Sequence, residues 1–64
     1  MIRWNTDEQR LLEKMEQRKF AESVTTTVLI ALRDDPSQFP QIEALLDSGA
    51  TERDMVKAVQ PFLR

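Results

Sequence analysis

Few side-chain types in this 64-residue sequence could take part in a chemical reaction. It contains no Cys, no His and no Tyr, and its one Gly is Gly49. It therefore lacks thiol nucleophiles, zinc-thiolate ligands and the imidazole that most often serves as a general base or transition-metal ligand. One glycine cannot build a glycine-rich phosphate loop. Only carboxylates, hydroxyls and basic side chains remain, and we expect no catalytic residues and no enzyme activity.

The acidic pair Asp34 and Asp35 is the remaining candidate for a metal site. A hard cation needs several oxygen ligands, whereas Asp beside a proline is typical of a helix end and turn. The sequence therefore predicts no metal and no other cofactor. The net charge of −2 argues against bulk attraction to nucleic acid or to an anionic membrane. With no long apolar run and no signal-peptide pattern, we expect a cytoplasmic protein without a membrane contact.

A long helix is predicted over residues 6–33. Asn5 and Thr6 can each begin it, because each has a Glu or Gln three residues further on, as in a capping box. Neither Gly nor Pro interrupts the segment before Pro36, and the residue before a proline is disfavoured in a helix.

Two apolar stripes run along this segment, out of phase by about half a helical turn. The first consists of Leu11, Leu12 and Met15, and the second of Phe20, Ala21, Val24, Val28, Ala31 and Leu32. The polar run 16–19 separates them. Either the chain breaks near Arg18, or one helix carries two faces that meet different partners. The absence of Gly and Pro favours the single helix.

Residues 24–30 allow a second interpretation, because β-branched side chains dominate them. A single strand in so short a chain would have to pair with another copy. The helical spacing of Phe20, Val24, Val28 and Leu32 favours the helix.

Two short helices are predicted in the C-terminal third, over about 40–48 and 52–60. Gly49 suits the left-handed position that follows a helix, and Thr51 can begin the final helix with Asp54 three residues on. Pro61 ends the regular helix near Gln60. The sequence therefore predicts an all-α fold in which residues 1–64 form a single helical domain of three or four helices.

Residues 45–51 resemble the opening of a helix-turn-helix DNA-binding motif, with Gly49 at the turn. The polar face of the last helix holds Arg53, Lys57, Gln60 and Arg64, at i, i+4, i+7 and i+11. Arg53, Lys57 and Arg64 could contact phosphates or base edges of DNA. Glu52 and Asp54 flank this face with charges that repel phosphate.

The strand interpretation gives a second resemblance. Residues 25–30 followed by two helices look like a ribbon-helix-helix repressor, whose paired strands enter the major groove. Neither face of such a strand would carry a basic side chain. A small DNA-binding regulator of one of these two types is therefore the alternative function.

The first apolar stripe favours protein binding as the main function. Two short helices cannot cover both stripes, which would leave the first one exposed on a protruding arm, and a contiguous exposed apolar patch is typical of a partner surface. The opposing interpretation is a four-helix intramolecular bundle with Trp4 capping the core.

We therefore predict a non-enzymatic protein-protein interaction module, acting as an adaptor, inhibitor or small chaperone. Its partner-binding anchors would be Trp4, Leu11, Leu12 and Met15, in the helix-in-groove mode. A small domain without Cys or a metal often gains stability by oligomerising, so we expect a homodimer that pairs through Leu11, Leu12 and Met15.

Overall fold

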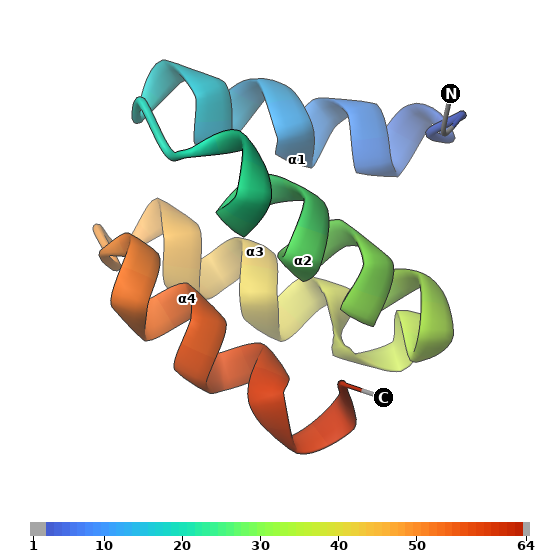
Figure 1. The fold of residues 1–64 in the computed structure, drawn as a ribbon. Helices are drawn as coiled ribbons and strands as arrows, with labels where there is room; N and C mark the ends of the chain where they lie inside the picture. Colours follow the sequence, from blue (N-terminus) through green and yellow to red (C-terminus); the bar gives the residue numbers. More distant parts are fainter. Residues whose placement is uncertain (1–2, 64) are drawn as a thin grey trace.

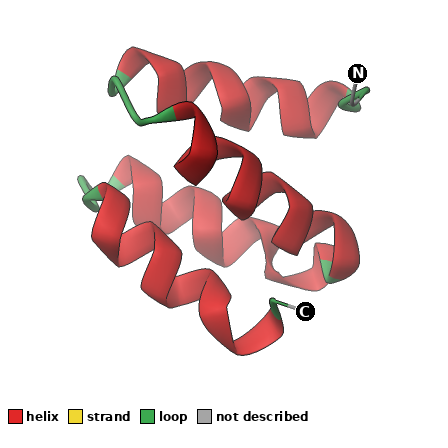
Figure 2. Ribbon diagram, viewed as in Figure 1, coloured by secondary structure: helices red, strands yellow, loops and turns green. Residues whose placement is uncertain are grey.

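The computed structural model describes residues 3–63 and folds them into four α-helices and two short 3₁₀-helices (Figure 1). In chain order these are α1 (Thr6–Gln17), α2 (Glu22–Asp34), η1 (Pro36–Gln38), α3 (Phe39–Asp47), α4 (Glu52–Val59) and η2 (Gln60–Phe62). Residues 3–63 contain no strand (Figure 2). The predicted all-α fold is confirmed.

The apolar side chains of the four α-helices meet in one core. Helix α2 lies between α1 and α4 and contacts both, and α3 packs against α4 (Figure 1). The buried apolar residues are Leu11, Met15, Val28, Leu29, Ala31, Leu32, Ile42, Leu46, Ala50, Met55 and Val59. Both predicted stripes therefore contribute to the same core.

The predicted single helix over residues 6–33 is wrong, because the chain turns between α1 and α2. Helix α1 ends in a Schellman motif. The Phe20 N–H donates to the Met15 carbonyl at 3.1 Å, and the Lys19 N–H donates to the Glu16 carbonyl at 2.9 Å. Lys19 has a φ of 60°, in the left-handed region that usually favours Gly. The break near Arg18, which was the alternative, is the arrangement found.

The half-turn offset between the stripes explains this break. A continuous helix would direct them to opposite sides, whereas the turn lets the second stripe face the first. Holding a residue other than Gly in the left-handed region costs about 1–2 kcal/mol. Burying one large apolar side chain contributes about 1.5–3 kcal/mol, so covering several of them outweighs that cost.

The strand interpretation of residues 24–30 is also wrong, since they lie within α2. Two of the threonines bond their hydroxyls within the helix. Thr25 Oγ1 donates to the Ala21 carbonyl at 3.2 Å, and Thr27 Oγ1 donates to the Ser23 carbonyl at 2.8 Å. These bonds satisfy the polar groups of a β-branched run that packs on the core, so tertiary burial overrides its preference for a strand.

The two short helices lie within one residue of their predicted bounds. Gly49 has a φ of 98° and follows α3 in a second Schellman motif, in which the Ala50 N–H donates to the Leu45 carbonyl. Thr51 and Asp54 form the predicted capping box at the start of α4. The same turn geometry therefore closes α1 and α3, with Lys19 in the place that Gly49 takes.

Replacing Lys19 with Val should lower the free energy of unfolding by about 1 kcal/mol, because a β-branched side chain is poorly tolerated at positive φ. Lys19→Asn is the matched control and should keep the wild-type stability, since Asn adopts this conformation readily. Urea denaturation followed by circular dichroism measures both variants. A Val variant as stable as the wild type would contradict a left-handed turn at this position.

Candidate functional site

Two of the four predicted anchors are not exposed. Leu11 and Met15 have 0% of their surface accessible and lie in the core. The predicted protruding arm is therefore wrong, and the four-helix intramolecular bundle describes the fold. The physical reason is the turn after α1, which brings α2 against the stripe that a straight helix would have left uncovered. Trp4 and Leu12 are half-buried and pack against the edge of the core.

Trp4 and Leu12 line a groove between α1 and α2, with a volume of about 260 Å³. We call this hollow the α1–α2 groove. Its lining consists of Trp4, Leu12, Glu16, Phe20, Glu22, Thr25, Thr26 and Leu29. The apolar part is supplied by two aromatic rings and two leucines, and the charged part by two exposed carboxylates. An apolar lining with a few charged groups is the composition of a ligand-binding hollow.

Trp4 is positioned by an ion pair that joins the buried Glu8 of α1 to the exposed Arg33 of α2. The Arg33 guanidinium lies over the Trp4 ring, 4.9 Å from its centroid, and donates to both Glu8 carboxylate oxygens at 2.7 and 3.1 Å. Arg33 also donates to the Arg3 carbonyl. Glu8 has only 4% of its surface exposed and closes the capping box by accepting from the Asn5 N–H at 2.9 Å.

The hydrogen bonds from Arg33 are the main reason that the pKa of Glu8 lies below its ordinary value. Burial opposes this shift, and the capping bond with Asn5 adds to it. The carboxylate therefore stays ionised in the fold and holds the guanidinium against the ring of Trp4.

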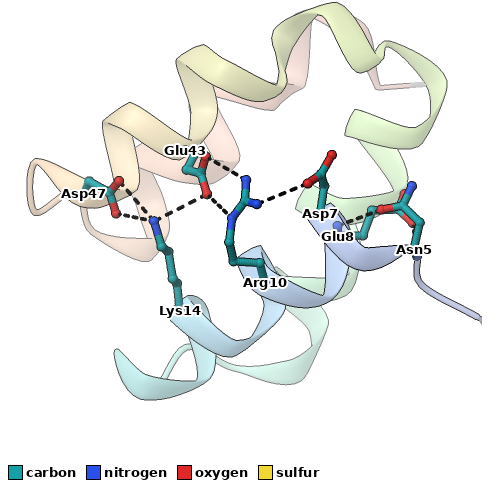
Figure 3. A network of polar contacts seen from close by, with 7 residues as sticks. All are labelled: Asn5, Asp7, Glu8, Arg10, Lys14, Glu43 and Asp47. Carbon is teal, nitrogen blue, oxygen red and sulfur yellow. Dashed lines mark hydrogen bonds and ion pairs between the residues drawn. The ribbon is translucent and has the colours of Figure 1, made fainter.

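The basic side chains of α1 are paired with α3 (Figure 3). Arg10 Nε donates to Glu43 Oε2 at 3.1 Å, and Lys14 Nζ lies 3.0 Å from Asp47 Oδ1 and 3.3 Å from Glu43 Oε2. The hydrogen bond from Arg10 lowers the pKa of Glu43, although burial opposes it. These charges join α1 to α3 within the chain.

The predicted nucleic-acid residues lie apart from the α1–α2 groove. Arg53 and Lys57 are exposed, one turn apart on α4, and Arg64 lies outside the described residues. Both carboxylates expected to oppose them bond backbone groups instead. Glu52 Oε2 accepts from the Ala21 N–H at 2.6 Å, and Asp54 Oδ2 accepts from the Thr51 N–H at 3.1 Å.

Within residues 3–63, no three potential metal ligands of the Asp, Glu, His or Cys type gather at one place. Nor is any helix in that part of the chain long and apolar enough to cross a membrane.

The sequence interpretation missed six residues that line the groove. They are Glu16, Phe20, Glu22, Thr25, Thr26 and Leu29. On α2, Glu22, Thr26 and Leu29 recur at i, i+4 and i+7, which is a signal for one helix face. This signal could be used only once the start of α2 was known, because the assumed helix over 6–33 gives no reason to place that face beside α1.

Replacing Glu8 with Gln should lower the free energy of unfolding at neutral pH by about 1–2 kcal/mol, because the charge-assisted bonds to Arg33 are lost. The pKa of Glu8 is lower in the folded chain than its ordinary value of 4.5, so its stabilisation is present above that value and is lost as the pH falls through the folded pKa. The stability difference between the two proteins should therefore shrink in acid.

Denaturation of both proteins from neutral to strongly acidic pH measures this difference, with the emission of Trp4, the single Trp, as the signal. Subtracting the free energy of unfolding of the variant from that of the wild type at each pH removes the contribution of the other carboxylates. A difference that stays constant across the whole pH range would show that the carboxylate charge of Glu8 is not what stabilises the fold.

Comparison with known proteins identifies no family for this chain. No protein-family model, no curated protein and no solved structure matches it. Its function is therefore inferred from the surfaces described above.

Proposed function

We propose that this protein is a non-enzymatic module that binds a protein partner in the α1–α2 groove. One observation carries the proposal: Trp4, Leu12 and Phe20 remain half-buried around a hollow, while Leu11 and Met15 of α1 are buried. Trp and other aromatic residues are enriched at binding hot spots, where they fill or line desolvated pockets. Trp4 and Leu12 are retained from the anchors predicted above, and the half-buried Phe20 takes the place of the fully buried Leu11 and Met15.

The position of the groove beside α1 suits a helical ligand. The groove follows α1 from Trp4 to Phe20, and α1 itself has 12 residues, or about 18 Å of helix. A partner helix lying alongside α1 could run parallel to it for about three turns and place one apolar side chain in the hollow. A role as an adaptor, an inhibitor or a small chaperone is consistent with binding of this kind.

Self-association belongs to the same proposal, although the pairing predicted from the sequence does not fit. Leu11 and Met15 have no accessible surface, so they cannot form a twofold interface with another copy. Any homo-oligomer would have to use surfaces that remain exposed.

DNA binding is less well supported. The predicted helix-turn-helix order is present in α3, the turn at Gly49 and α4. However, Arg53 and Lys57 are the only cations on the described part of the α4 face, and α4 has only eight residues. Proteins that bind DNA specifically generally neutralise several phosphates, and the net charge of −2 gives no additional attraction.

The groove is tested by replacing Leu12 with Glu, which should reduce partner affinity more than tenfold by placing a charge in the apolar hollow. Ile30→Glu is the matched control, because Ile30 is 41% exposed on α2 and does not line the groove. Affinity capture from the native host with quantitative mass spectrometry compares the wild type with both variants, and circular dichroism verifies the fold. A partner retained equally by Leu12→Glu would contradict binding in the groove.

A further inference from the structure

Helix α4 presents a basic face with one aliphatic side chain to the surface. Arg53, Val56, Lys57 and Gln60 recur at i, i+3, i+4 and i+7, and we call them the α4 ridge. Val56 is half-buried and the other three are exposed, and together with Val24 of α2 and Glu52 they line a shallow hollow between α2 and α4. An aliphatic side chain therefore lies between two cations on this face. Residues at this spacing share one face of a helix, and here the face combines one aliphatic side chain with two cations.

The charges of the α4 ridge and of the α1–α2 groove are opposite. The ridge carries Arg53 and Lys57, and the groove carries Glu16 and Glu22. Within residues 3–63 none of these four side chains forms an ion pair. The two carboxylates that flank Arg53 in sequence, Glu52 and Asp54, bond the backbone N–H groups of Ala21 and Thr51. Neither forms an ion pair with a cation of the ridge within residues 3–63, so both cations can pair with a partner.

The apolar parts are complementary as well. The methylene stems of Arg53 and Lys57 can lie along apolar surface while their charged heads reach carboxylates. A guanidinium or ammonium group also stacks favourably on aromatic faces, and the groove presents the rings of Trp4 and Phe20. The groove therefore offers both kinds of contact that the ridge requires.

We propose that the α1–α2 groove receives the α4 ridge of a second copy of this chain. The proposal rests on the groove being the protein-binding site, as argued above, and it names the partner. Because the groove and the ridge are different surfaces, the contact is heterologous, and it leaves one free groove and one free ridge in every pair. Helices α1 and α4 lie on opposite sides of α2 (Figure 1), so the copies join head to tail and do not close reciprocally.

The association is expected to be weak. A standard protein interface removes about 800 Å² from each partner, close to a fifth of the 4446 Å² of accessible surface of this chain. A single eight-residue helix buries less than that. The average mass should therefore rise with protein concentration, pass beyond that of a dimer, and fall when salt screens the charges.

Reversing the charges tests the proposal. One variant carries Glu16→Lys and Glu22→Lys, and the other carries Arg53→Glu and Lys57→Glu. Each variant alone should associate at least about tenfold more weakly than the wild type, because like charges face each other across the contact. An equimolar mixture should recover the association, since each groove then meets a ridge of opposite charge.

Sedimentation equilibrium at low salt measures the average mass, and circular dichroism confirms that each variant is folded. The control variant, Glu13→Lys with Asp34→Lys, changes the net charge by the same amount as the groove variant, at exposed positions that do not line the groove. It should associate as the wild type does.

Several results would overturn the proposal: a wild type that stays monomeric or stops at a dimer, a single variant that associates normally, or a mixture that does not recover. A monomeric wild type would leave the α1–α2 groove as a binding site for other proteins. The Leu12→Glu capture comparison decides that question separately.

Discussion

The turn between α1 and α2 is the constraint on which the rest of this structure depends. The two apolar stripes of the N-terminal half lie half a helical turn apart, so a straight helix cannot bury both against the same neighbours. A left-handed residue at Lys19 redirects the chain, and the loss of backbone freedom is offset by burial of both stripes in one core. A chain of 64 residues has few other apolar side chains, so the core depends on both stripes being buried.

Arg18 connects this turn to the second one. Its guanidinium donates to the carbonyls of Leu46 at 2.8 Å and Ala50 at 2.6 Å, at the carboxyl end of α3, where unpaired carbonyls attract a cation. The same group lies 5.3 Å from the centroid of the Phe20 ring. One side chain therefore holds both chain reversals together and also positions an aromatic ring that lines the α1–α2 groove.

The packing also decides which side chains remain available for binding. Leu11 and Met15 are used by the core, whereas Leu12, one position away on α1, is left at the edge of the groove. On the other side of α2, the acidic residues at the start of α4 bond backbone N–H groups and leave the basic residues free. The chain thus presents an acidic apolar hollow and a basic ridge, although its net charge is near zero.

The sequence by itself determined the helical class, the capping box at Thr51, the turn at Gly49 and the bounds of the two short C-terminal helices, and it limited the first cap to Asn5 or Thr6, of which Asn5 is used. These features depend on local chemistry, since a cap or a glycine acts within a few residues of its own position. The tertiary structure alone decided the break after α1. A Gly at position 19 would have indicated a turn in the sequence, but this position is Lys19. The tertiary structure also decided the burial of Leu11 and Met15 and the assembly of the groove. These depend on contacts between helices distant in sequence, because the burial of a stripe is determined by what packs against it and not by its own spacing.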